Sequence, residues 1–187
     1  MISPRFARRS TGGRSPPDPL EYFRANDDMM PRPATPGDHH AIWDIVRPVF
    51  RAGTTYAIDP DISRTDALAY WTAHHAYVTE LDGQIVGTFY IRPNQQGGGA
   101  HVCNCGYITA AEAQGKGVAR AMLNFSLDEA KRLGFEAMQF NFVLANNTRA
   151  VSTWERAGFA VIGRIPKAFK DRDDRYIDAL IMHRFLS

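Results

Sequence analysis

A glycine-rich turn that runs directly into an amphipathic helix has the residues to hold an anion. Gly115 and Gly117 flank Lys116. Arg120 follows in the first helical turn. The first N–H groups of a helix have no partner within it, and the helix dipole favours negative charge there. Because glycine also lets a ligand approach the backbone closely, this turn is a candidate phosphate or pyrophosphate site.

Two common phosphate motifs do not fit the turn. A Walker loop requires a glycine where Ala110 stands. A dinucleotide-binding fingerprint requires a third glycine where the chain has Arg120. From the turn alone, an ordinary glycine-rich helix start remains an open alternative, because such anion-ready helix ends are common.

Hydrophobic periodicity predicts the elements around the turn. Apolar residues at helical spacing predict a helix from Val118 to Leu133, which Gly134 ends. Further helices are expected to open at Thr35, Ser63 and Asn147. The predicted strands are Pro31–Ala34, Ala76–Glu80, Ile85–Arg92, His101–Thr109, Ala137–Val143, Ala160–Arg164 and Tyr176–Arg184. This order predicts an α/β fold with helices around one mixed central sheet.

Three connections and one helix carry their own expectations. Asp82-Gly83 predicts a tight hairpin. Pro48 is expected to kink or shorten the first helix. Pro93–Ala100 is expected to be a mobile glycine-rich loop, and Pro166–Arg175 a basic loop between the last two strands.

Composition narrows the class of protein. The 187 residues are enough for one domain with a core, and 44% apolar with 22% charged residues is typical of a globular chain. A net charge of +2 is too small to indicate a nucleic-acid partner. No apolar run approaches the roughly 18 residues of a membrane span, so no membrane partner is expected.

The first segment differs from the rest of the chain. Residues 1–30 are rich in Arg, Ser, Gly and Pro, a composition that rarely folds alone. A disordered extension is therefore expected there, followed by one domain over residues 31–187. Met29 and Met30 stand directly before that domain, so a start of translation at this point remains an open alternative.

The cysteine pattern indicates neither a disulfide nor a metal site. The two cysteines, Cys103 and Cys105, lie on one face of a predicted strand, roughly 7 Å apart. His101 shares that face, but residues in line on one strand do not converge on a tetrahedral ion. No metal is therefore expected, and buried thiols in a reducing cytoplasm are the simplest interpretation.

A second motif, downstream of the glycine-rich turn, narrows the choice of protein family. Gln114–Ala119 fits the pattern Q/R-x-x-G-x-G/A, and Asn147–Phe159 fits N-x-x-A-x-x-x-[YW]-E-x-x-G-F. Together, with a strand between them, they resemble the two signatures of the GNAT superfamily of N-acetyltransferases. The resemblance implies the GNAT fold over residues 31–187, with fourth and fifth strands that splay apart at one end.

The resemblance also implies acetyl-CoA as co-substrate, held between those two strands. Its pantetheine arm would pair with the edge formed by Tyr107, Ile108 and Thr109, and the N–H near Ile108 would polarise the thioester carbonyl. Asn147 would hydrogen-bond the arm. The pyrophosphate would be held by Gln114, Gly115, Lys116, Gly117, Val118, Ala119 and Arg120.

One position departs from the family pattern. Many relatives have a tyrosine acid where Trp154 stands. The tryptophan N–H cannot protonate a leaving thiolate at neutral pH. Trp154 is therefore expected to pack over the cofactor and the core.

Shorter runs resemble small-amine detoxifying members of the family, of the azetidine-2-carboxylate and phosphinothricin acetyltransferase kind. Thr55 and Tyr56 fall in one such run and are expected to bind substrate. In these relatives, asparagines that match Asn104 and Asn141 serve substrate or cofactor. Both lie in apolar strands, where an unpaired buried amide costs about 1–3 kcal/mol. They are expected to orient the amine and a water, and a structural hydrogen bond between strands is the alternative.

The general base remains open. An alkylamine arrives protonated and must lose a proton before it attacks. Besides a water held by Asn141, the candidates are Glu80, His101, Tyr107 and Glu112. The sequence does not choose among them.

The leading hypothesis is direct acetyl transfer from acetyl-CoA to the primary or secondary amine of a small molecule: an amino acid, an analogue or a polyamine. Acetylation of a protein N-terminus or lysine is one alternative, and a non-catalytic acyl-CoA sensor is another. A cytoplasmic location follows from the thiols, and a homodimer is the default assembly.

Overall fold

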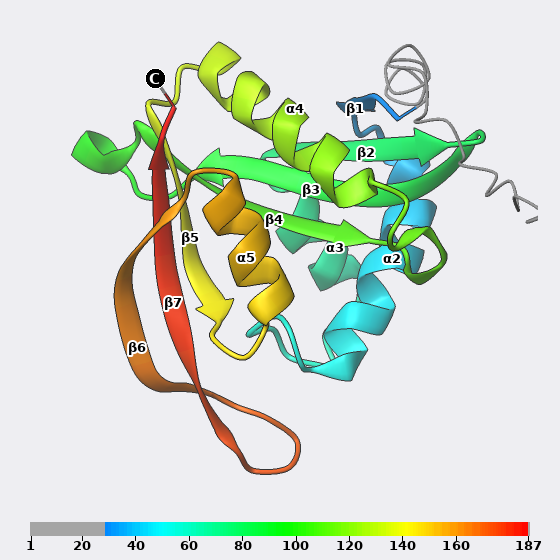
Figure 1. The fold of residues 1–187 in the computed structure, drawn as a ribbon. Helices are drawn as coiled ribbons and strands as arrows, with labels where there is room; N and C mark the ends of the chain where they lie inside the picture. Colours follow the sequence, from blue (N-terminus) through cyan, green and yellow to red (C-terminus); the bar gives the residue numbers. More distant parts are fainter. Residues whose placement is uncertain (1–28, 187) are drawn as a thin grey trace, which may run out of the picture.

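One sheet organises the protein, and the computed structural model describes residues 29–186 of it. The strands follow the order β1-β2-β3-β4-β5-β7-β6 (Figure 1). β4 and β5 run parallel, and every other neighbouring pair is antiparallel. The strands are β1 (Pro31–Pro33), β2 (His75–Leu81), β3 (Gln84–Pro93), β4 (Val102–Thr109), β5 (Ala137–Leu144), β6 (Ala160–Lys170) and β7 (Tyr176–Phe185). The predicted α/β class with a mixed sheet is confirmed.

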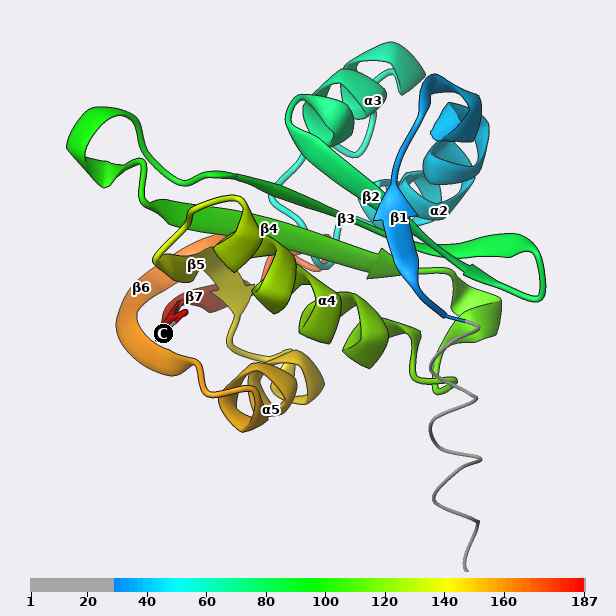
Figure 2. The ribbon, with the colours of Figure 1, turned by 90° about the horizontal axis from the view of Figure 1, so that it is seen from above.

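Helices cover both faces of this sheet. Figure 2 shows α2 and α3 on one face and α4 and α5 on the other. The helices are α2 (His39–Ala52), α3 (Arg64–Thr72), α4 (Val118–Arg132) and α5 (Thr148–Arg156). Short 3-10 turns lie at Pro36–Asp38, Gly97–Gly99 and Ala111–Ala113.

α2 is not shortened at its internal proline. The helix continues past Pro48 to Ala52 and ends at Gly53, whose φ is 60°. Phe50 is 1% exposed, so its burial in the core holds the last turn in place.

α4 lies close against β3 because Gly87 has no side chain. A Cβ at Gly87 would stand 2.8 Å from Cγ1 of Val118 and 2.9 Å from Sδ of Met122. Gly117, with a φ of 89°, opens the helix, and Gly134, with a φ of 88°, follows its end. The helix predicted from periodicity therefore has the expected limits.

β6 extends further than predicted. It runs to Lys170, so the first half of the predicted loop Pro166–Arg175 is strand. β6 lies at one edge of the sheet, and its pairing with β7 is irregular between Ile165 and Phe169. A proline is tolerated at such a point because its missing N–H breaks no ladder bond.

β4 and β5 separate soon after they meet. Ladder contacts join only Val102 to Ala137 and Cys103 to Met138. β5 pairs with β7 on its other side, and the arrowheads of β4 and β5 point in different directions in Figure 1. The edge of β4 from residue 104 onward therefore faces a gap in the sheet, which confirms the predicted splay of the fourth and fifth strands.

The described residues start two positions before the predicted domain boundary at residue 31. Met29 is 9% exposed and packs on the core, whereas residues 1–28 of the predicted extension lie outside the described residues. None of the helices over residues 29–186 combines the length and apolar character needed to cross a bilayer. Within the same residues, no group of three or more His, Cys, Asp or Glu side chains is arranged to hold a metal ion.

Candidate active site

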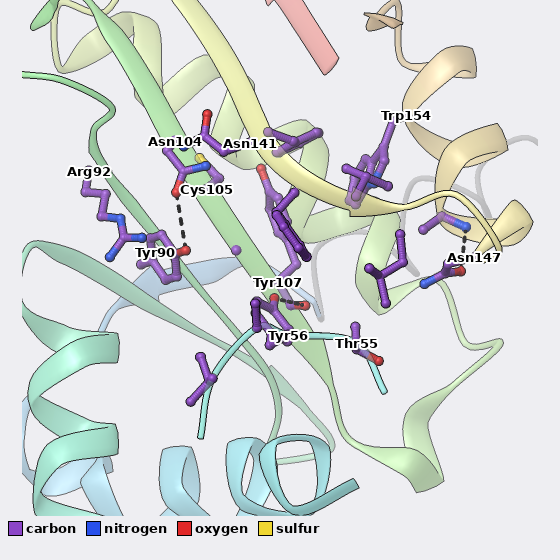
Figure 3. A pocket seen from close by; sticks show the side chains of 18 of the residues that line it. Thr55, Tyr56, Tyr90, Arg92, Asn104, Cys105, Tyr107, Asn141, Asn147 and Trp154 are labelled. Atoms are coloured by element: carbon purple, nitrogen blue, oxygen red, sulfur yellow. Dashed lines mark hydrogen bonds between the residues drawn. The ribbon is translucent and has the colours of Figure 1, made fainter. Parts of the chain in front are cut away.

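A cavity of about 360 Å³ lies in the gap between β4 and β5 (Figure 3). It extends from the loop after α2 to the start of α5. The sequence-predicted residues that line it are Thr55, Tyr56, Asn104, Tyr107, Asn141, Asn147 and Trp154. The structure therefore brings together the predicted substrate residues and part of the predicted cofactor site.

The backbone of β4 presents alternate residues to the gap. At one end of the strand, the N–H of Asn94 donates to the carbonyl of Val102 at 2.8 Å. At the other end, the N–H of Ala110 donates to the carbonyl of Val86 at 2.8 Å. The register between these points is unbroken. Because ladder bonds alternate in an antiparallel pair, the even-numbered residues of β4 bond to β3 and the odd-numbered residues face the gap.

This alternation corrects the predicted oxyanion donor. The N–H of Ile108 points to β3, so it does not face the gap. The amides that face the gap are those of Tyr107 and Thr109. The hydroxyl of Tyr56 donates to the carbonyl of Tyr107 at 3.0 Å, which agrees with this direction.

Tyr56 and Tyr90 line the cavity and pack on buried aromatic rings behind it. The ring of Tyr56 makes edge contacts with Phe50 at 5.8 Å and Trp71 at 5.9 Å, and Trp71 lies 5.0 Å from Tyr90. Burial raises the pKa of the Tyr56 and Tyr90 hydroxyls well above its usual range. Both hydroxyls therefore stay protonated and can donate hydrogen bonds.

Asn104 makes the hydrogen bond between strands that was the alternative to a role in substrate binding. Its Nδ2 donates to the carbonyl of Gln139 on β5 at 3.0 Å, and its Oδ1 accepts from the Tyr90 hydroxyl at 3.3 Å. At 7% exposure, this amide bridges β4 and β5 just beyond their last ladder contact. It lines the cavity, but both ends of its amide already have protein partners.

Asn141 is exposed, and its predicted burial was wrong. The pairing of β5 with β7 is irregular between Phe140 and Val143, and Asn141 lies within that irregularity. Its Nδ2 donates to Asn94 at 2.6 Å, and its Oδ1 accepts from Gln139 at 2.8 Å. This amide can therefore meet solvent or a bound molecule at the cavity wall.

Sequence reasoning missed the charged residue of the cavity. Arg92, near the end of β3, lines it together with Tyr70 and Tyr90. Its guanidinium lies 4.6 Å from the ring centre of Tyr90 and 4.9 Å from that of Tyr70. The sequence did hold one signal for this residue. Arg92 is a single arginine at the end of an apolar strand, and that strand precedes the one that carries Asn104.

α5 contributes the opposite wall. Asn147 caps this helix, and its Oδ1 accepts from the N–H of Ala150 at 3.1 Å. The ring of Trp154 lies 4.7 Å from Phe140 and 5.4 Å from Tyr107. Trp154 therefore packs on the core side of the gap, and a role of either residue toward a cofactor stays a prediction.

The glycine-rich turn lies at the open end of β4, outside the cavity (Figure 1). Gly115 and Gly117 have φ values of 81° and 89°, which favour glycine. Lys116 and Arg120 are exposed. Val118 is 1% exposed, so its part in binding a ligand stays a prediction.

None of the four side chains considered as general base is poised in the cavity. Glu80 is ion-paired at 2.6 Å to an arginine of β1. His101 and Glu112 are exposed and do not line the cavity. Burial raises the pKa of the Tyr107 hydroxyl, which bonds to a serine of α4 at 2.7 Å. Within residues 29–186, no Asp, Glu or His lines the cavity.

Comparison with known proteins agrees with this geometry. The family model described as the acetyltransferase (GNAT) family matches residues 39–159. A GCN5-related N-acetyltransferase from Kribbella flavida is 37% identical with a TM-score of 0.80, over 85% of this chain and 98% of that one. A phosphinothricin acetyltransferase from Sinorhizobium meliloti, solved with acetyl-CoA, shares the fold at 19% identity and a TM-score of 0.76, over 86% and 89% of the two chains.

Two curated relatives match part of the chain. N-acetyltransferase aca1 of Schizosaccharomyces pombe is 37% identical over 98 residues, 52% of this chain and 47% of that protein. Protein SPT10 of Saccharomyces cerevisiae is 28% identical over 89 residues, 48% of this chain and 14% of that protein. The chain thus spans less than half the length of these relatives.

Proposed function

The chain belongs to the acetyltransferase (GNAT) family, and on that premise we propose that it transfers an acetyl group from acetyl-CoA to the primary or secondary amine of a small molecule. The gap between β4 and β5 carries the proposal, because it leaves a row of strand amides beside a cavity. An extended ligand that contains amides can join such an edge as an added strand.

The proposed acetyl-CoA site combines three groups of residues. The edge amides of Tyr107 and Thr109 pair with the pantetheine arm. Asn147 and Trp154 form the wall beside that arm. The turn and the start of α4 bind the diphosphate through backbone N–H groups and two cations: Gln114, Gly115, Lys116, Gly117, Val118, Ala119 and Arg120.

Transfer is proposed to be direct. The neutral amine attacks the thioester carbonyl and a C–N bond forms. The C–S bond then breaks, the CoA thiolate leaves, and the nitrogen gives up a proton to water as the amide forms. Burial raises the pKa of the Cys105 thiol well above its usual range, so this cavity residue is a poor nucleophile for an acyl-enzyme route. Binding both reactants side by side supplies much of the rate. The amide of Tyr107 or Thr109 replaces that of Ile108 as the oxyanion donor.

The amine proton is proposed to leave through water. An alkylammonium has a pKa of about 10, and the described part of the chain places no carboxylate or imidazole at the cavity to accept its proton. The exposed amide of Asn141 can hold a water at the wall, although the amide itself is not a base. Trp154 does not protonate the thiolate, which leaves as the anion or takes a proton from solvent.

The cavity favours a small acceptor over a protein chain. Its volume of about 360 Å³ lies at the lower end of small-ligand pockets, which run from about 300 to 1,000 Å³. A cytoplasmic location belongs to the same proposal, because Cys103 and Cys105 are both free thiols. A homodimer remains the default expectation for its assembly.

A thiol-release assay tests the proposal. The full chain is supplied with acetyl-CoA and a panel of amino acids, polyamines and peptides, and free CoA is measured. We expect turnover with small amines. Turnover with peptides alone would identify a protein acetyltransferase instead. Tight acetyl-CoA binding without turnover of any amine would identify a sensor.

A further inference from the structure

Among the described residues that line the acceptor cavity, Arg92 alone is charged, and its charge is positive. We propose that Arg92 determines specificity by binding a carboxylate of the acceptor amine, so that amino acids are preferred to amines without an acid group. This inference rests on the proposed acetyltransferase function and concerns the same cavity. It separates amino acids from the other proposed acceptors, because polyamines and simple alkylamines lack the carboxylate that Arg92 would bind.

Arg92 is held at the cavity wall by aromatic rings rather than by an acid. Its guanidinium lies 4.6 Å from the ring centre of Tyr90 and 4.9 Å from that of Tyr70, and its Nη2 donates to the Tyr70 hydroxyl at 3.2 Å. Cation–π contacts orient a guanidinium without neutralising it. The head group is therefore positioned, and it keeps its full charge.

In the part of the chain that the structure describes, Arg92 has no ion-pair partner. Arg32 shows the contrast, since it pairs with Asp38 at 2.9 Å and Glu80 at 2.6 Å. The hydrogen bond to Tyr70 uses one N–H of Arg92 and leaves others of its five for a ligand. A carboxylate matches the guanidinium fork and can accept two parallel hydrogen bonds.

The electrostatic balance of the cavity points the same way. Arg92 is half-buried, and the other lining residues are uncharged. A partly desolvated positive charge attracts an anion and repels a second cation more strongly than it would in water.

Arg92 also lies at the proper end of the cavity for this role. It is the ladder partner of Asn104, and Figure 3 places these two residues on one side of the cavity and Asn147 on the other. The proposed acetyl-CoA wall is formed by Asn147 and Trp154. An acceptor whose acid lies at Arg92 would therefore direct its amine toward the thioester.

Matched pairs of acceptors test the inference in the thiol-release assay. Proline is compared with pyrrolidine and alanine with ethylamine, so that each pair differs by a carboxylate. The wild-type chain is expected to favour the acid in each pair. Arg92→Met is expected to lower kcat/KM for the acids about 10- to 100-fold through KM, since hydrogen bonds to charged groups have about that effect. The same variant should leave ethylamine and pyrrolidine nearly unchanged.

Two further variants separate charge from folding. Arg92→Lys keeps the charge without the fork, and it should retain part of the preference. Arg47→Met, at an exposed arginine of α2 that does not line the cavity, should change nothing. Equal kcat/KM within the pairs for wild type, or an equal loss for both members in Arg92→Met, would overturn the inference while leaving the acetyltransferase proposal intact.

Binding measurements keep the two proposals distinguishable. If no amine is acetylated, the proposed function fails, and NMR titration of proline and pyrrolidine into wild type and Arg92→Met still decides the role of Arg92. Proline binding that is lost in the variant supports the role. Proline binding that is unchanged in the variant, or no stronger in wild type than pyrrolidine binding, overturns it.

Discussion

The ring of Tyr90 lies so close to Gly106 that a Cβ on the glycine would stand 2.6 Å from the ring. The two residues are direct partners in the β3–β4 ladder. Tyr90 in turn donates to Asn104 and lies under Arg92. A missing side chain on β4 therefore leaves room for the Tyr90 ring at the cavity.

Gly106→Ala is expected to displace the Tyr90 ring and disturb Arg92 with it. Overpacking of this kind costs about 1–3 kcal/mol of unfolding free energy, and we expect the KM for the acceptor to rise as well. Gly163→Ala is the matched control, because the nearest atom to its new Cβ would be 3.4 Å away. Denaturant unfolding and steady-state kinetics measure both effects. An unchanged acceptor KM in a folded Gly106→Ala variant would show that Tyr90 does not shape the acceptor site.

Gly117→Glu is expected to abolish acetyl-CoA binding. Its φ of 89° disfavours any side chain, and the added carboxylate would face the proposed diphosphate site at the start of α4. Gly83→Glu makes the same change at a φ of 74° in the β2–β3 hairpin, and it should leave the affinity unaltered. Calorimetry measures the acetyl-CoA affinity of both variants. Full affinity in Gly117→Glu would remove the turn from the cofactor site.

Asn141→Ala is expected to lower turnover while leaving acetyl-CoA affinity nearly unchanged. The exposed amide is proposed to hold the water that accepts the amine proton, and loss of such assistance typically slows a reaction about 100-fold or more. Asn146→Ala, at an exposed residue that does not line the cavity, is the control. Kinetics equal to wild type would restrict Asn141 to its contacts with Asn94 and Gln139.

The Asp38 carboxylate predicts a loss of stability in acid. Hydrogen bonds from Arg32, and then from Thr35, hold the pKa of Asp38 far below its usual value of 3.8. The unfolded chain therefore binds more protons than the folded one, so this stabilisation is complete above about pH 5 and declines as the pH falls further. We expect the contribution to be roughly 1 kcal/mol, because water screens the half-exposed Arg32.

Asp38→Asn should therefore lower the unfolding free energy at pH 7 and make it less dependent on pH below 5. Denaturant unfolding at pH 7, 5 and 3 measures this, with Asp128→Asn on the exposed face of α4 as the control. A variant whose pH profile runs parallel to wild type would show that Asp38 does not carry this dependence.

Local signals in the sequence predicted most of the fold. Asp82 and Gly83, with φ values of 53° and 74°, form the expected tight turn. Ser63 caps α3 through a bond from the Asp66 N–H at 3.1 Å. These features succeed because turns and caps depend on a few neighbouring residues. The family motifs added the splay of β4 and β5, which no local pattern specifies.

The site was predicted less completely, because its geometry depends on how separate strands and helices pack together. Which amide faces the gap depends on the pairing of β4 with β3, so the choice of Ile108 missed by one residue. Exposure of Asn141 depends on an irregularity between β5 and β7. Arg92 gains its position only where Tyr70 of α3 and Tyr90 of β3 come together.

The narrow join between β4 and β5 has a consequence for the whole molecule. Two ladder pairs, the hydrogen bond from Asn104 to Gln139 and a weak contact from the Tyr107 hydroxyl to Sδ of Met138 at 3.6 Å link these two strands. A pantetheine arm bound in the gap between β4 and β5 would bridge the N-terminal and C-terminal halves of the sheet. The melting temperature should then rise with the concentration of acetyl-CoA. In a cell with little acetyl-CoA, the protein would be less stable and more readily degraded.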